Sequence, residues 1–154
     1  MEKTVRISLI IILIISSINI SIGCDCLMTP LENHLEKVNI ILRVKAIQIL
    51  DTKEEREDYS NPNFKIEENI GYRAKFKIIN NLKGNFNKGD TININSTFSN
   101  CEMKYKISTE YILFLRLDKG EYFMETCSYS QAIKNNRKSK RYYKKILRKL
   151  KIKN

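Results

Sequence analysis

The sequence is poor in the residues and motifs on which most enzymes depend. It contains one histidine, His34, no tryptophan and only five glycines in 154 residues. There is no Gly-rich phosphate-binding loop and no Ser-His-Asp or Cys-His arrangement, and the acidic residues gather in one polar stretch, 51–69. We therefore expect a binding protein that is not an enzyme and that needs no cofactor of its own.

A long hydrophobic run is also missing, which decides how the N-terminus is interpreted. The apolar stretch Ile7–Ile15 is well short of the roughly 20 residues that cross a bilayer as a helix. It follows a basic start and precedes small side chains at Ser21 and Gly23, as in a secretory signal peptide. We expect residues 1–23 to be removed on export, so that Cys24 begins a protein that is extracellular or, in a bacterium, periplasmic.

Only four cysteines are present, and all of them follow the predicted signal peptide. An even number of cysteines in a small exported domain indicates two disulfides. A bond between Cys24 and Cys26 would close a strained ring around a single residue. Two pairings remain, and in each of them Cys24 and Cys26 are joined to Cys101 and Cys127. This spacing is not that of a zinc site.

Acidic residues are absent from the C-terminal segment. Residues 24–133 contain 15 basic and 16 acidic side chains, whereas residues 134–154 contain 11 basic side chains and no acidic one. Apolar residues in this segment recur at helical spacing, at Tyr143, Ile146, Leu147 and Leu150. A basic amphipathic helix is expected from about Ser139 to Lys151. We favour a helix docked on the domain with a solvated basic face over a dedicated site for an acidic polymer or a membrane surface.

Between these two ends, apolar and polar residues alternate as they do in strands with one buried face. Strands are expected at Val38–Leu50, Tyr72–Ile78, Ile92–Phe98, Tyr111–Leu117 and Glu121–Cys127, with residues 51–69 as an exposed loop or hairpin tip. Five strands in about 90 residues predict a mainly β fold. The expected architecture is a five-stranded antiparallel barrel of the oligonucleotide- and oligosaccharide-binding type.

A short helix is expected before the first strand. Thr29 can cap it, Pro30 suits its first position, and Glu32 would complete a capping box. Its apolar stripe consists of Leu31, Leu35 and Val38. His34 lies off that stripe, so we expect a solvated side chain.

The order of these features resembles that of the tissue inhibitors of metalloproteinases, whose inhibitory domain is a netrin-like module. The resemblance is carried by Cys24-Asp25-Cys26, Val38–Ala46, Tyr72–Ile79 with Leu82-Lys83-Gly84, Cys101, Glu110–Leu113 and the strand ending at Cys127. It covers residues 24 to about 135, and the chain is most similar to the short, single-domain members of that family. It implies an oligonucleotide-type barrel and the pairings Cys24–Cys101 and Cys26–Cys127.

The resemblance also implies a mechanism of inhibition. In that family, the α-amino group and the carbonyl of the first mature cysteine bind the catalytic zinc of a metalloprotease and displace its water. Here that residue is Cys24, and the zinc belongs to the partner protease. Asp25 would enter the specificity pocket, where the family usually has Thr or Ser, with Cys26 beside it. A second contact strip would be formed by Phe98, Ser99 and Asn100.

Two other functions compete with inhibition. The first is a non-inhibitory netrin-like module, in which both N-terminal cysteines are structural and the 134–154 tail binds an acidic polymer. The second is an envelope lipoprotein, because bacterial lipoproteins begin at a lipidated cysteine and Gly23 suits their signal. Lipidation would consume the thiol and the amine of Cys24 and so exclude zinc chelation. Nucleic acid is not expected as a partner of an exported protein.

Overall fold

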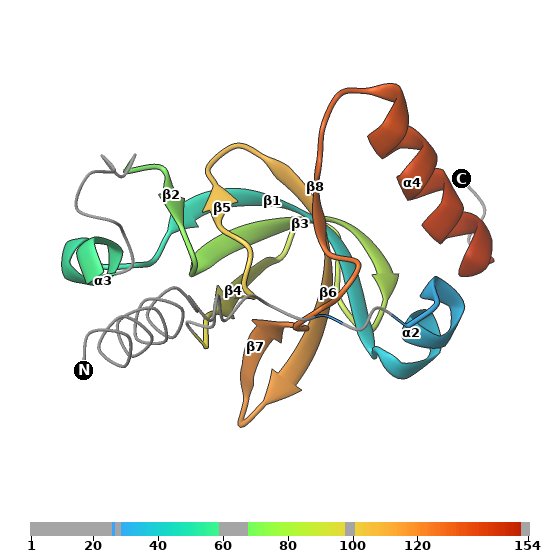
Figure 1. Ribbon diagram of the computed structural model, residues 1–154, viewed down its shortest axis with the longest axis horizontal. Coiled ribbons are helices and arrows are strands. Elements are labelled where there is room, and N and C mark those ends of the chain that lie inside the picture. The colour runs from blue at the N-terminus through green and yellow to red at the C-terminus, as the bar shows by residue number, and fades with distance from the viewer. Residues whose placement is uncertain (1–25, 27–28, 59–67, 98–100, 152–154) are drawn as a thin grey trace, which may run out of the picture.

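The computed structural model describes residues 26, 29–58, 68–97 and 101–151 (Figure 1). The predicted signal peptide, Cys24, Asp25 and the predicted contact strip 98–100 lie outside the described residues. Within the described part of the chain, no helix is both long enough and apolar enough to cross a membrane.

The structure is mainly β and is built around a closed five-stranded barrel. Its strands are β1 (Ile40–Ile49), β3 (Ala74–Lys83), β4 (Thr91–Asn95), β6 (Glu110–Asp118) and β7 (Glu121–Met124). They are arranged around the barrel in the order β1-β3-β4-β7-β6, and β6 pairs back with β1 to close it. Apolar side chains on the inner faces fill the barrel, including Val44, Phe76, Ile94 and Leu113. The five predicted strands and the barrel are thus confirmed.

The prediction that all strand pairs are antiparallel is wrong. β4 and β7 run parallel, with Ile94 opposite Tyr122 and Asn95 opposite Phe123. The reason lies in the connection, since β6 crosses over to pair with β1 and β7 returns antiparallel along β6. The returning strand then lies beside β4 in the same direction, which a count of strands and turns does not reveal.

Three short strands lie outside the barrel. β2 (Ile70–Gly71) and β5 (Tyr105–Lys106) form a separate two-stranded sheet, and β8 (Gln131–Ile133) pairs antiparallel with the first residues of β6. Strands of two or three residues have no measurable periodicity, so the sequence did not predict them. β8 leads directly into the C-terminal helix and so determines where that helix begins on the barrel (Figure 1).

Helices α2 (Leu31–Lys37) and α4 (Arg137–Lys149) share a second hydrophobic cluster outside the barrel. The cluster combines residues of both helices with outward-facing strand residues, and its fully buried members include Ile41, Ile112, Phe114 and Ile146. α4 begins two residues earlier than expected because Asn136 caps it, its side-chain oxygen accepting a hydrogen bond from the Ser139 N–H at 2.8 Å. The basic helix is therefore docked on the barrel, as favoured from its spacing.

The stretch expected to be an exposed loop begins with a helix instead, α3 (Lys53–Asp58). Thr52 and Glu55 form a reciprocal capping box, with the Glu55 N–H donating to Thr52 Oγ1 at 3.2 Å and the Thr52 N–H donating to Glu55 Oε2 at 2.7 Å. The spacing Thr52-x-x-Glu55 is the sequence signal of this helix start.

The capping box predicted for α2 is wrong by one residue. The N-cap is Pro30, and no side chain caps it, because the helix begins at Leu31. Glu32 then lies too early in the helix to reach back to Thr29. It pairs instead with Lys149 of α4 at 2.7 Å, and this hydrogen bond lowers the pKa of Glu32.

Candidate functional site

A disulfide fastens the start of the described chain to the end of the barrel. Cys26 is bonded to Cys127, three residues beyond β7, with the two Cα atoms 5.3 Å apart and 101 residues of separation in sequence. This is one of the two pairs that the resemblance implies. Cys101 is also disulfide-bonded; its predicted partner Cys24 lies outside the described residues, so that pairing stays a prediction.

A hydrogen bond next to this bridge fixes the chain that follows Cys26. The hydroxyl of Tyr129, two residues after Cys127, donates to the carbonyl of Thr29 at 2.8 Å. Leu31 and Leu35 of α2 then bury their side chains in the second cluster. The segment that would present the mature N-terminus is therefore held by a covalent bond, a hydrogen bond and apolar packing in succession.

Glu102 organises the two ends of the predicted contact strip. Its carboxylate accepts hydrogen bonds from the Thr97 N–H at 2.7 Å and the Thr97 hydroxyl at 2.6 Å, and from the hydroxyl of Ser96. These residues immediately flank 98–100, which lie outside the described residues. One acidic side chain thus ties together the two points at which the strip leaves and rejoins the described chain.

Glu102 was not among the site residues predicted from the sequence. The signal that would have found it is an acidic residue next to Cys101 and within a few residues of a Ser-Thr pair, which is too common a pattern to be specific.

His34 is not the solvated residue that was expected. It is half-buried, its ring centroid lies 5.3 Å from that of Phe114 and 5.6 Å from that of Tyr129, and its Nε2 atom has no hydrogen-bond partner within the described residues. Burial lowers the pKa of His34, against an opposing effect of Glu125. The prediction is wrong because His34 follows Leu31 by three residues and precedes Val38 by four, so it lies on the same side of α2 as the apolar stripe.

This burial predicts a loss of stability on mild acidification. Because the folded-state pKa of His34 lies below its ordinary value of 6.5, the unfolded chain takes up the proton first. The stabilising effect of neutral His34 is complete above about pH 6.5 and is lost progressively as the pH falls below it. We expect His34→Leu to reduce the difference in urea midpoint between pH 7 and pH 5.5. An unchanged difference would contradict this account.

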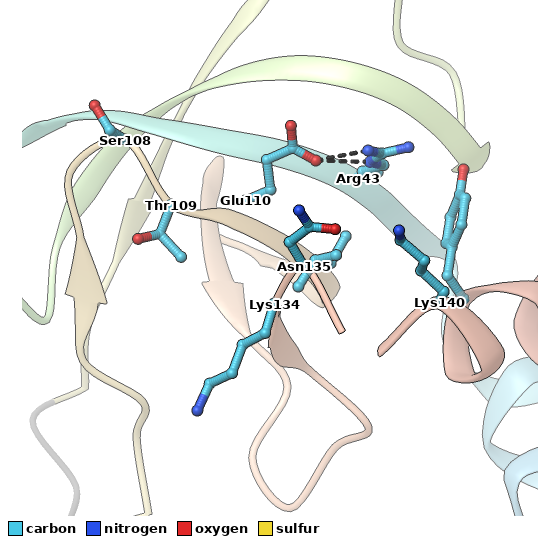
Figure 2. Close-up of a pocket in the computed structure, with 9 residues that line it drawn as sticks. Arg43, Ser108, Thr109, Glu110, Lys134, Asn135 and Lys140 are labelled. Atoms are coloured by element: carbon cyan, nitrogen blue, oxygen red, sulfur yellow. Dashed lines mark hydrogen bonds and ion pairs between the residues drawn. The ribbon is translucent and has the colours of Figure 1, made fainter. Parts of the chain in front are cut away.

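A cavity of about 560 Å³ lies where β8 leads into α4, against β1 and the start of β6 (Figure 2). It is lined by Arg43, Ser108, Thr109, Glu110, Ile133, Lys134, Asn135, Lys140 and Tyr143. Arg43 donates to Glu110 Oε2 from Nε at 3.0 Å and from Nη2 at 2.7 Å, and its guanidinium lies 5.0 Å from the centre of the Tyr143 ring. Burial is the largest single influence on the pKa of Arg43 and would lower it, but Glu110 and Tyr143 together outweigh burial and the pKa is raised.

The remaining polar groups of this cavity come from two elements. Lys140 extends from α4 toward the side where the Arg43–Glu110 pair lies, and the Asn135 amide points the same way, whereas the Lys134 ammonium points away from that pair (Figure 2). Arg43 is neutralised by Glu110, so Lys134 and Lys140 supply the cavity's net positive charge. The cavity therefore offers cations, hydroxyls and an amide to a polar ligand.

The described part of the chain holds no candidate metal centre, because no group of three or more His, Cys, Asp or Glu side chains there is placed to bind a metal ion. The sequence matches no protein-family model and no curated protein.

Proposed function

We propose that the chain is an exported, single-domain inhibitor of a zinc metalloprotease that acts through the backbone of Cys24. The observation that carries this proposal is the Cys26–Cys127 bridge. A covalent bond two residues after the proposed chelator restricts the motion of the mature N-terminus, so less conformational entropy is lost when it enters an active site. The Thr29–Tyr129 hydrogen bond continues the same restraint.

The finer fold assignment belongs to this proposal. An oligonucleotide-type barrel has five strands in a Greek-key arrangement, and the order β1-β3-β4-β7-β6 supports that assignment for the netrin-like domain. In this arrangement the chain before α2 and the connection from β4 to β5 are the two predicted contact segments. Cys127 and Cys101 would fasten them through the predicted pair of disulfides.

The proposed chemistry requires an unblocked amine. An α-amino group has a pKa near 7.7–8.0, so a substantial fraction is unprotonated and able to bind zinc at neutral pH. The amine and the carbonyl of Cys24 would occupy the coordination sites of the water that the protease activates.

Asp25 would narrow the choice of target. Burial of an unpaired carboxylate in an apolar pocket costs several kcal/mol. We therefore propose that the target protease has a cation or several hydrogen-bond donors in its specificity pocket.

The decisive experiment moves the α-amino group away from Cys24. Mass spectrometry first verifies that the secreted protein begins at Cys24 with an unmodified amine, and the protein is then titrated against a panel of zinc metalloproteases. Addition of one alanine before Cys24 should weaken inhibition at least about 100-fold, because the amine no longer reaches the metal, whereas one alanine added after Asn154 should leave it unchanged.

Two results would refute the mechanism. One is inhibition that is equally strong with and without the added N-terminal alanine. The other is a lipidated Cys24, since its amine would normally be acylated.

A separate variant tests the role of Asp25. Asp25→Thr should strengthen inhibition of proteases with apolar specificity pockets and weaken inhibition of the natural target.

A further inference from the structure

Four cations form a straight row on α4. Arg137, Arg141, Lys144 and Arg148 follow one another at i, i+4, i+7 and i+11. With 3.6 residues per turn and a rise of 1.5 Å, they lie within about 60° of arc over about 16 Å of helix. All four side chains are exposed. We call this row the cationic stripe.

The cationic stripe faces away from the barrel because the opposite side of α4 is buried. Ile146 is 0% and Leu147 is 3% exposed. The Tyr143 hydroxyl accepts from Asn80 Nδ2 at 3.1 Å, and the Tyr142 hydroxyl donates to the carbonyl of Tyr129. α4 is therefore fixed in rotation, and it stands at the side of the molecule (Figure 1).

No described residue forms an ion pair with a cation of the stripe. Residues 134–154 contain no acidic side chain. Within the described residues, Lys149 is the only cation of α4 in an ion pair, and it lies outside the stripe. A row of cations held close together by a rigid helix is an attractive site for a linear polyanion, since binding relieves their mutual repulsion and releases counterions.

The stripe is continuous with the cavity between β8 and α4. Lys140 lines the cavity and lies three residues after Arg137 and four before Lys144, which makes it a neighbour of both on the helix surface. Hydroxyls of Ser108 and Thr109 and the amide of Asn135 line the same cavity. Hydroxyls and amides can form hydrogen bonds with sugar hydroxyls, and cations can pair with acidic substituents.

We propose that α4 binds an acidic polysaccharide, with its carboxylate or sulfate groups along the cationic stripe and one sugar unit in the cavity. A membrane fits less well, because a helix bound to a bilayer buries its apolar face in it, and the apolar face of α4 is already buried against the barrel. Binding of such a polymer does not depend on protease inhibition, which involves a different segment.

The test compares two triple variants of the whole mature protein with the same change in charge. R137Q/R141Q/K144Q removes three stripe cations, and K77Q/K88Q/K119Q removes three exposed cations of the barrel. We expect the stripe variant to bind heparin at least about tenfold more weakly at physiological salt, with a salt dependence shallower by about one unit for each lost contact. The barrel variant should bind within about twofold of the unmodified protein.

Three further measurements identify the partner class. The unmodified protein should bind heparin more tightly than duplex DNA, and the cavity variant T109V/N135A should reduce this preference while the helical content stays unchanged. The unmodified protein should not bind vesicles made of equal parts of phosphatidylcholine and phosphatidylserine at the same salt. Equal losses in the two triple variants, or equally tight binding of DNA or vesicles, would overturn the proposal.

Discussion

Replacement of both cysteines of the Cys26–Cys127 bridge by serine is expected to destabilise the protein by about 4 kcal/mol. The bridge closes a loop of 101 residues, and in the chain-entropy model a loop of that length restricts the unfolded chain by roughly 4–5 kcal/mol at 25 °C. Both cysteines are half-buried, so the substitution creates no large apolar cavity. The loss comes mainly from the greater freedom of the unfolded state.

Urea unfolding of C26S/C127S measures this loss as a lower midpoint. The matched control is Thr126→Ala, which alters an exposed side chain next to Cys127 but leaves the covalent loop intact. We expect this surface substitution to change the stability by no more than about 0.5 kcal/mol. A loss below about 1 kcal/mol in the double cysteine variant would show that other contacts already hold the N-terminal segment.

The bridge also couples stability to the proposed inhibition. Without it, the described part of the segment before α2 keeps the Thr29–Tyr129 hydrogen bond and the packing of α2, and the predicted Cys24–Cys101 bond would still fasten its first residue. Folded C26S/C127S protein, studied at low temperature, should therefore inhibit its target more weakly even where it is fully folded. Folding of the variant does not by itself restrict the motion of the N-terminal segment as the bridge does.

The elements that were predicted well from the sequence have a local cause. β1 was expected at Val38–Leu50 and spans Ile40–Ile49 because a run of β-branched residues favours a strand wherever it lies. α4 was expected within two residues of its actual limits because its apolar spacing and its cations recur with a helical period. Each of these elements is specified by residues close together in the chain.

The features that the sequence did not predict depend on contacts between distant residues. Arg43 and Glu110 are 67 residues apart and meet only because β1 and β6 close the barrel. The parallel pairing of β4 and β7 and the burial of His34 against Phe114 have the same origin. Of the candidate site, Cys26 and Cys127 were paired in advance by resemblance, since residue spacing alone left two pairings open.

Asp51 is expected to be the most sensitive charged residue of the barrel. It is the only buried polar or charged residue in the described part of the chain, and its side chain is 1% exposed. Both carboxylate oxygens accept from the Arg73 N–H, at 3.2 and 3.1 Å, and the Arg73 Nε lies 3.7 Å from Oδ1. Asp51→Ala leaves this N–H without its acceptor and removes one of the two carboxylates beside the guanidinium, which keeps its ion pair with Glu55, so we expect a loss of about 3 kcal/mol.

Gly71 provides an independent test of the same contact. A Cβ atom at this position would lie 1.9 Å from Asp51 Oδ2 and 2.5 Å from Ile49 Cγ2. Gly71→Ala should therefore cost about 2 kcal/mol by steric conflict. Asp51→Asn, which keeps one acceptor but loses the charge, should cost about half as much as Asp51→Ala.

The double variant D51A/G71A distinguishes this explanation from general damage to the barrel. If the carboxylate is what the new methyl group meets, its removal makes room for that methyl group, and the double variant should lose about 1 kcal/mol less than the sum of the two single losses. The remaining conflict with Ile49 prevents a full rescue. Strictly additive losses in urea unfolding would show that the two residues act independently, and the loss in Gly71→Ala would then not come from contact with the Asp51 carboxylate.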